Sequence, residues 1–224
     1  MNIKVDPAAV TPEQFFSWVT TQDGRYELVD GEVVMMAGAG RRHDAIVVNL
    51  TAALHAQTRS GPCQTFTGGT YVVITPSTRR MPDLGVDCGK PAEDSLVADR
   101  PALLVEVLSP TTGGFDVTVK LAEYQGLRCL DYILFVDTDS PNVHLYSRGP
   151  DSAWTDAVLK GLDAIIRLDT LNVTLRLHDV YAGLEFRPRP RRVMARDATA
   201  RDEPRTGCGP IVPASGPATR HRRS

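Results

Sequence analysis

Apolar residues recur along the chain with two different periods, which predict where its helices and strands lie. Helical spacing in residues 43–58 places five apolar side chains on one face: Ile46, Val47, Leu50, Ala53 and Leu54. A short helix is expected after Thr11, a favoured N-cap residue that precedes a cluster of apolar side chains. A third helix is expected over FDVTVKLAEYQGL, residues 115–127, where apolar side chains again follow helical spacing.

Strand patterns fill much of the remaining sequence. RYELVDGEVVMM alternates between polar and apolar side chains around Asp30-Gly31, and this dipeptide is a strong signal for a tight hairpin turn. Further strands are expected in the following ranges: 64–75, 82–88, 102–108, 130–137, 142–148 and, more weakly, 153–160, 164–168 and 172–177, before a closing turn at 179–185. The order helix, strands, helix, strands predicts an α/β domain with a mixed sheet.

Charge is distributed unevenly along the 224 residues. From Arg187 onward there are ten arginines, no lysine and three acidic residues, a balance of +7. The whole chain has a formal net charge of −2, so the preceding residues carry −9. We therefore expect a folded domain over residues 1–187 and a disordered Arg/Pro-rich tail over 188–224, because the tail has too few large apolar residues to form a core. Such a tail is either a solvated extension or a non-specific contact for nucleic acid.

The sequence lacks the signals of membrane and secreted proteins. No apolar run approaches the roughly 20 residues that a membrane span needs, and the N-terminus has no secretory pattern. The four cysteines are scattered, with no CxxC pair, which argues against a zinc ribbon or a disulfide framework. We expect a cytoplasmic protein that contacts no membrane.

Glu106 is out of place in its surroundings. It interrupts the apolar segment LLVEVL, residues 103–108, which is typical of a buried strand. A carboxylate removed from water costs several kcal/mol unless a cation or hydrogen bonds compensate it. The sequence therefore predicts that something positive faces Glu106.

Two nearby patterns supply candidates for that partner. Asp83 begins the strand in MPDLGVD, and Asp116, Lys120 and Tyr124 repeat every four residues, so they share one face of the third helix. If that helix folds back over adjacent strands, two carboxylates and an ammonium group meet. Hard oxygen ligands favour Mg²⁺ or Mn²⁺, and Lys120 would then orient or deprotonate an attacking water and neutralise charge on a phosphate.

At these residues the chain resembles the PD-(D/E)XK nuclease superfamily and, within it, the Uma-two family of restriction endonucleases. The resemblance covers roughly residues 26–146 and lies in six pieces: RYELVDGEVV, His43 at a helix start, PDLGV, LLVEVLSPTT, the D-x3-K-x3-Y series and DYILFVD. It implies a restriction-endonuclease-like mixed sheet flanked by helices on both faces. An extra N-terminal hairpin and C-terminal strands complete the expected fold.

The resemblance also implies roles for individual residues. Asp83 and Glu106 correspond to metal ligands, with the backbone carbonyl of Val107 as a third, and His43 and Glu27 gain places at the site. The chain departs from the superfamily at Leu108, where the acid-x-Lys motif has its lysine. Lys120 resembles a relocated substitute. Family members are often homodimers, and their substrate class implies a nucleic-acid partner, most simply DNA.

Each candidate also has a simpler structural interpretation. Glu106 could pair with Lys120 alone, Asp83 could be a solvated turn residue, and Lys120 with Asp116 could be an exposed helix pair. Asp116 is expected at the helix start, where a carboxylate satisfies free backbone N–H groups. Solvated, packing or surface roles are the alternatives for the remaining residues: His43, Glu27, Tyr124, Arg41, Arg42, Arg79 and Arg80.

Three functions use these residues. The first is a metal-dependent endonuclease that hydrolyses phosphodiester bonds in DNA. The second is a catalytically inactive nuclease-fold module that binds nucleic acid or protein, which the acidic balance of the domain favours. The third is a metal-dependent hydrolase of another phosphorylated substrate, because a fold does not fix its substrate.

Overall fold

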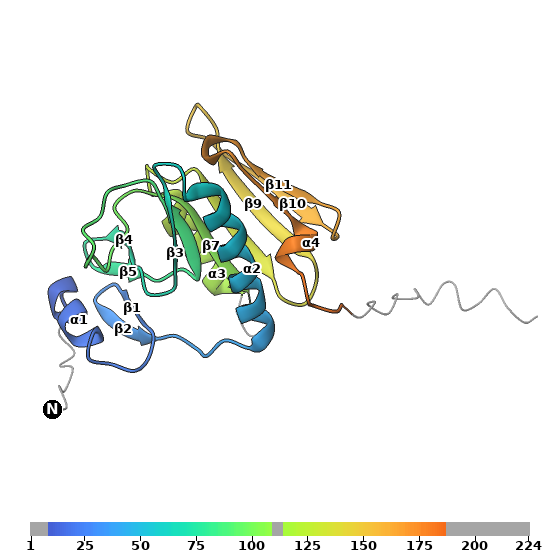
Figure 1. Ribbon diagram of the computed structural model, residues 1–224. Coiled ribbons are helices and arrows are strands. Elements are labelled where there is room, and N and C mark those ends of the chain that lie inside the picture. The colour runs from blue at the N-terminus through green and yellow to red at the C-terminus, as the bar shows by residue number, and fades with distance from the viewer. Residues whose placement is uncertain (1–8, 109–113, 187–224) are drawn as a thin grey trace, which may run out of the picture. The chain divides into compact units, whose positions relative to one another are not determined.

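The computed structural model describes residues 9–108 and 114–186, without the side chains of residues 114–116. These residues belong to one compact unit, Met1–Phe186 (Figure 1). The tail expected over 188–224 lies outside the described residues, so the boundary between domain and tail stays a prediction.

A six-stranded sheet forms the centre of the unit. Its strands lie in the order β10-β9-β8-β7-β6-β3. In the order of the chain they are β3 (Gln64–Thr67), β6 (Leu84–Asp87), β7 (Pro101–Leu108), β8 (Tyr132–Asp137), β9 (Asn142–Arg148) and β10 (Trp154–Lys160). β7 and β8 pair in parallel, whereas the other neighbours are antiparallel. Helix α3 (Gly114–Gln125) follows β7 and precedes β8 in the chain. The α/β class with a mixed sheet is confirmed.

Helices cover the two faces of this sheet. Helix α2 (Arg41–Thr58) packs its buried residues, Ile46, Leu50 and Leu54, into one apolar core with alternate residues of β7. The intervening residue Leu104 belongs to a second core, which includes Tyr124 of α3. Because successive side chains of a strand point to opposite faces, β7 is buried on both sides. This explains the apolar run that surrounds Glu106 in the sequence.

A second sheet contains the predicted N-terminal hairpin. Its order is β2-β1-β5-β4, and its strands are β1 (Tyr26–Val29), β2 (Glu32–Met35), β4 (Val72–Thr75) and β5 (Thr78–Arg80). The turn residues Asp30 and Gly31 have φ values of 50° and 82°, as the hairpin signal requires. Helix α1 (Pro12–Val19) contacts β1 and begins at Thr11, whose side chain accepts a hydrogen bond from the Gln14 amide. Both local predictions are confirmed.

The prediction of a single strand over residues 64–75 was wrong. The structure has two strands there, β3 and β4, which belong to different sheets. Gly68-Gly69 separates them, and Gly69 has a φ of +140°, which side-chain-bearing residues rarely adopt. The three-residue strand β5 was not expected, because TRR has no apolar alternation.

The structure contains one disulfide that the scattered cysteines did not predict. Cys63 and Cys88 form a disulfide across the β3–β6 pair. The register pairs Gln64 with Asp87, so that Cys63 and Cys88 come next along the two antiparallel strands. A separation of 25 residues with no motif left no signal in the sequence. Cys129 is a free cysteine.

The C-terminal part packs beside α2. Strands β11 (Ile165–Leu168) and β12 (Val173–Arg176) form a hairpin joined by the 3-10 helix η1 (Asp169–Leu171), and α4 (Leu177–Val180) follows. Their apolar side chains complete the core under α2. None of the helices within residues 9–108 and 114–186 is both long and apolar enough to span a membrane.

Candidate functional site

Glu106 faces α3, on the side of β7 that also carries Leu104. Its side chain is buried, and the Lys120 Nζ lies 3.1 Å from its Oε1 and 3.2 Å from its Oε2. The Tyr124 hydroxyl donates a hydrogen bond of 2.6 Å to the same Oε1. Lys120 and Tyr124 reach one carboxylate because residues four apart lie on one face of a helix. The cation that Glu106 required therefore comes from α3.

Glu27 brings the hairpin sheet to the same cluster. It lies in β1 and is 4 % exposed, so it is not the solvent-facing strand residue that its position also allowed. Its Oε1 lies 3.4 Å from the Lys120 Nζ and accepts a hydrogen bond from the Met81 amide. Lys120 thus lies between two carboxylates from different sheets.

Asp83 lies one residue before β6 and is held from two directions. Its Oδ2 accepts a 2.8 Å hydrogen bond from the Val107 amide and lies 3.1 Å from the His43 Nε2. Burial raises the pKa of Asp83, but the hydrogen bonds from His43 and Val107 outweigh this effect. The net shift of the Asp83 pKa is therefore downward. His43, in the first turn of α2, is buried rather than solvated, and its hydrogen bond to Asp83 raises its pKa.

Glu106 has the opposite shift. Burial raises its pKa to about 7, an effect that Lys120 opposes and that the neighbouring charge of Asp83 reinforces. A second positive charge close to Glu106 would favour its ionised form and lower its pKa again. Asp83 and Glu106 therefore form an ionised carboxylate beside one that resists ionisation.

Arg80 corrects one expectation. Its guanidinium is buried, not on the surface and not free for phosphates: Nη1 lies 2.9 Å from the Glu27 Oε2, and Nε and Nη2 donate to both carboxylate oxygens of Glu123 at 2.7 Å and 2.8 Å. Arg80 thereby ties the hairpin sheet to α3. Glu123 and Arg80 were missed as members of the cluster, since neither stands out in sequence from ordinary surface charges.

The other candidate arginines also have structural partners. The Arg42 Nε donates to the Thr138 carbonyl at 3.0 Å and its Nη1 to the Glu185 carbonyl at 3.1 Å. The Arg79 Nη1 donates to the carbonyls of Thr75 and Thr78. Arg41 is exposed at the first position of α2. Asp116 belongs to α3, but its side chain lies outside the described part of the chain.

The site residues open into a pocket of about 340 Å³. It brings together side chains from β1, β2, α2, β7, α3 and the residue before β6, among them Arg25, Glu27, His43, Asp83, Glu106, Val107, Leu108 and Lys120. Leu108 is therefore at the pocket wall, and Lys120 enters the same pocket from α3.

The donors in this pocket suit a hard cation better than a soft one. Across residues 9–108 and 117–186, no three His, Cys, Asp or Glu side chains gather in a way that could hold a metal. Mg²⁺ and Mn²⁺ need fewer protein ligands, because they keep several waters and bind through one or two carboxylates. Asp83 and Glu106 are two carboxylates that line one pocket, which is the number that such an ion needs.

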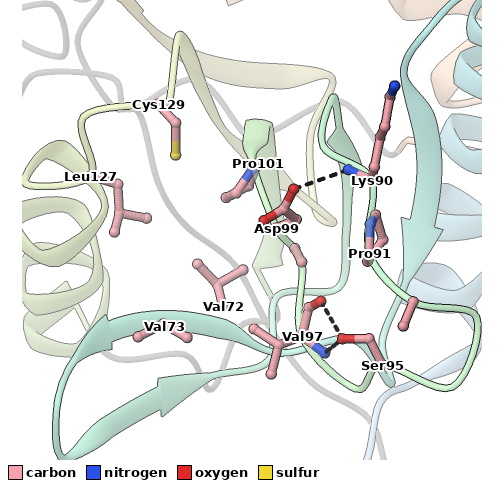
Figure 2. Close-up of a pocket in the computed structure, with 12 residues that line it drawn as sticks. Val72, Val73, Lys90, Pro91, Ser95, Val97, Asp99, Pro101, Leu127 and Cys129 are labelled. Atoms are coloured by element: carbon pink, nitrogen blue, oxygen red, sulfur yellow. Dashed lines mark hydrogen bonds between the residues drawn. The ribbon is translucent and has the colours of Figure 1, made fainter.

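A second pocket, of about 540 Å³, shares no lining residue with the pocket that contains Asp83 and Glu106 (Figure 2). Apolar side chains such as Val72, Val97 and Leu127 form much of its wall. The Asp99 carboxylate accepts a 3.0 Å hydrogen bond from the Lys90 amide, and burial raises the pKa of the Cys129 thiol. Figure 2 shows the Lys90 ammonium group pointing away from the pocket. The lining of this pocket does not resemble the group of Glu27, Asp83, Glu106 and Lys120, which we call the acid and lysine cluster.

One solved structure is similar to this chain in fold, and two curated proteins are similar to it in sequence. A crystal structure of a "putative nuclease belonging to DUF820" from Anabaena variabilis superposes with a TM-score of 0.63 at 16% identity, over 77% of this chain and 97% of that one. Two proteins of Synechocystis described as uncharacterized, slr1290 and sll1609, are 25% and 26% identical, over 79% and 66% of this chain and 94% and 85% of their own lengths.

The family model gives the assignment that these likenesses leave open. The model described as "Uma2: Putative restriction endonuclease" matches residues 12–178, a range that runs from the first helix to α4 and contains every residue of the acid and lysine cluster. The chain therefore belongs to the Uma2 family of restriction-endonuclease-like proteins.

Proposed function

We propose that the protein is a metal-dependent endonuclease that hydrolyses phosphodiester bonds in DNA. The observation that supports this most directly is the meeting of Asp83, Glu106 and Lys120 in one pocket, with the Lys120 Nζ 3.1 Å from the Glu106 Oε1. Membership of the Uma2 family, described as "Putative restriction endonuclease", supports the proposal, and so does the similar fold of the protein titled a "putative nuclease".

Asp83, Glu106 and the Val107 carbonyl would hold Mg²⁺ or Mn²⁺. Such an ion lowers the pKa of a bound water and offsets the negative charge of a phosphate. Asp83 is prepared for this role because the Val107 amide and His43 keep its carboxylate ionised and fixed in orientation. The Val107 amide thus orients Asp83. The Val107 carbonyl, the proposed third ligand, belongs to the same residue near the end of β7.

Lys120 acts on the water and the phosphate. Its ammonium group lies between Glu106 and Glu27, so the charge of the side chain is held at the pocket rather than in solvent. From there it orients the attacking water and stabilises the charge that develops on the phosphate, which is the role of the missing strand lysine.

Three further residues support this centre. Tyr124 is a positioning residue, because its hydroxyl donates to Glu106 and is fully buried. Glu27 positions Lys120 and is itself fixed by Arg80. His43 hydrogen-bonds to Asp83 and lines the pocket, which places it within reach of a substrate as well.

The direct test is cleavage of plasmid DNA by the purified full-length chain with Mg²⁺, with Mn²⁺ and with EDTA. We expect cleavage with either metal and none with EDTA. Asp83→Asn keeps an oxygen that can accept from the Val107 amide but removes the charge, so it should abolish both cleavage and the thermal stabilisation by Mn²⁺.

Two results would contradict the proposal in different ways. Undiminished cleavage in EDTA would exclude the metal-dependent mechanism. Failure to cut any DNA or RNA with either metal would favour the inactive nucleic-acid or protein-binding module, an alternative that the −9 balance of residues 1–186 makes worth testing.

We also propose that the protein is a homodimer. Strand β2 is the edge of the hairpin sheet, and Val34 and Met35 on it are 43 % and 68 % exposed. Exposed apolar side chains on an edge strand favour association with another chain. Light scattering of the purified protein should give twice the mass of the chain, and a monomer at all concentrations would contradict the proposal.

A further inference from the structure

Two pockets meet at Arg25, His43 and Asp83. One is the 340 Å³ pocket that contains Glu106 and Lys120. The other, of about 590 Å³, runs along α2, and its wall includes Val47, Val48, Thr51, Ala52 and His55. All three junction residues line both pockets, so a ligand that extends beyond the carboxylates meets Arg25 where it crosses from one to the other.

The Arg25 guanidinium has unmet hydrogen-bonding capacity at this junction. Its Nη2 lies 3.8 Å from the Asp83 Oδ1, which is too long for a hydrogen bond. Within the described chain, its Nε and Nη2 are shielded from solvent and have no hydrogen-bond partner. The side chain as a whole is still 40% exposed. Leaving charged donors unsatisfied is costly. The exposed part of the side chain lines both pockets, so a small turn of the guanidinium brings these donors to an anion in either pocket.

Gly68 provides the space in which the guanidinium lies. A Cβ at position 68 would overlap the Arg25 Nη2 and would come within 3.0 Å of its Cζ. The Gly68 amide donates to the Asp83 carbonyl at 2.8 Å, which fixes this backbone beside the residue that Arg25 faces. The glycine therefore determines where the arginine head group lies.

The pocket along α2 has the character of a nucleotide subsite. Val47, Val48 and Ala52 supply an apolar wall, and His55 lies on the same helix. The Thr51 Oγ1 is another shielded polar atom that has no hydrogen-bond partner among the described residues. A base next to a bound phosphate needs this combination of apolar surface and a few polar groups.

We propose that Arg25 binds a backbone phosphate of the nucleic acid adjacent to the phosphate at Asp83 and Glu106. The substrate strand then passes from the carboxylate pocket into the pocket along α2. An arginine suits this position because its planar guanidinium can bind two phosphate oxygens at once. The inference rests on the proposed function, since it assumes that nucleic acid is the substrate.

A purely structural role for Arg25 makes different predictions. If Arg25 only offsets the charge of Asp83, Arg25→Lys would bind nucleic acid as wild type does, and Arg25→Ala would tighten the binding of Mn²⁺. If Arg25 contacts a phosphate, its removal instead weakens nucleic-acid binding and reduces the salt dependence of that binding. Binding in the absence of cleavage therefore separates the two.

The experiment measures the anisotropy of short fluorescein-labelled DNA and RNA, as duplexes and single strands, with full-length protein in EDTA and separately in Ca²⁺. Salt is varied in each series. Arg25→Ala should weaken binding about 10-fold, because a hydrogen bond to a charged group contributes about 1.5 kcal/mol or more. The slope of log affinity against log salt should fall by about 1. Arg25→Lys should bind with intermediate affinity.

Gly68→Ala tests the same contact without changing Arg25. The new methyl group must displace the guanidinium, the flexible end of a side chain, so the domain should fold and bind as weakly as Arg25→Ala. Gly61→Ala is the matched glycine control, because its Cβ would lie 3.4 Å from the Thr58 carbonyl, an ordinary contact. Arg167→Ala on β11 removes an equal charge from a residue that lines neither pocket.

The outcomes distinguish this inference from the function on which it rests. Weak binding by Arg25→Ala and Gly68→Ala, with both controls like wild type, supports the phosphate contact. Wild-type binding by both variants, while the parent protein binds and cleaves DNA, overturns the contact alone. If the parent protein binds no DNA or RNA in either EDTA or Ca²⁺, the endonuclease and the phosphate contact fall together.

Discussion

The two faces of the six-stranded sheet differ in the side chains that strand β7 buries on them. On the face covered by α2, Leu103, Val105 and Val107 of β7 join an apolar core that extends to β11 and β12. On the face covered by α3, Leu104 is apolar, but Glu106 meets an ammonium group and a phenol. One face holds the domain together, and the other holds charges that cost free energy to bury.

The charged face carries an unusual amount of buried charge. Five charged side chains, Glu27, Arg80, Asp83, Glu106 and Lys120, are all at most 8 % exposed. They concentrate around the ends of β6 and β7 and the adjoining hairpin sheet. A purely structural core gains little from such a cluster, because well-packed apolar residues of similar volume are often as stable.

Among substitutions on the two faces of the sheet, we expect the largest effect from the replacement of Lys120. Lys120→Ala removes the cation that faces Glu106 and the water, so cleavage should fall by a factor of about 10² to 10³. Metal binding, followed as the shift in Tm with Mn²⁺, should largely persist because Asp83 and Glu106 remain. Lys120→Arg, which keeps the charge, is the matched control. Cleavage at the wild-type rate by Lys120→Ala would assign the role to another residue, with His43 as the first candidate.

The apolar face should respond in stability instead of chemistry. Leu103 is fully buried against α2, so Leu103→Ala should lower the free energy of unfolding by about 2–5 kcal/mol. Val158→Ala on β10 removes a side chain that is 45 % exposed and should change it by less than about 0.5 kcal/mol. Urea denaturation measures both. Equal effects of the two substitutions would mean that the α2 face is not the stabilising one.

A smaller, pH-dependent effect should mark the charged face. The pKa of Glu106 rises from 4.5 to about 7 on folding, so between these values the native chain binds a proton that the unfolded chain has released. Its contribution to stability is therefore lost as the pH rises from 4.5 to about 7. One pKa unit is worth about 1.4 kcal/mol, so wild type should lose more than about 1 kcal/mol relative to Glu106→Gln between pH 5 and pH 8.

His43 must be considered in that measurement, because its pKa is also raised and its stabilising pair with Asp83 is likewise lost at higher pH. The difference between wild type and Glu106→Gln cancels this shared contribution to first order. A pH-independent difference would show that Glu106 ionises in the folded protein as it does in water. Adding Mn²⁺ at pH 8 should stabilise wild type more than Glu106→Gln.

Sequence patterns predicted what depends on neighbours in the chain. Thr11 caps α1 and Asp30-Gly31 turns the hairpin, because both are governed by a few consecutive residues. The meeting of Lys120 and Tyr124 with Glu106 also followed from four-residue spacing on the helix after the strand. The acid in an apolar run was the clearest single indication of the site.

Contacts between distant segments could not be predicted in this way. Arg80 is separated by 53 residues from Glu27 and by 43 from Glu123, and their pairing depends on how β5 docks beside β1. Cys63 and Cys88 meet only because β3 and β6 pair in one register. Arg25 begins the stretch RYELVDGEVV, but the sequence gave no indication of its role, since the unmet donors of its guanidinium exist only once Gly68 and Asp83 are in place.

The wide spacing of the cluster along the chain also bears on how the protein folds. Its members come from β1, α2, the start of β6, β7 and α3, and the parallel pairing of β7 with β8 closes only after α3 has crossed between them. Contacts between distant segments form slowly, because closing the long loop between them costs conformational entropy before the contact lowers the free energy. Lys120 and Glu106 are only 14 residues apart, so their pair can form as soon as α3 packs on β7, whereas Arg80 and Glu27 are 53 residues apart and pair only once the hairpin sheet has formed. We therefore expect the buried charges to assemble in that order.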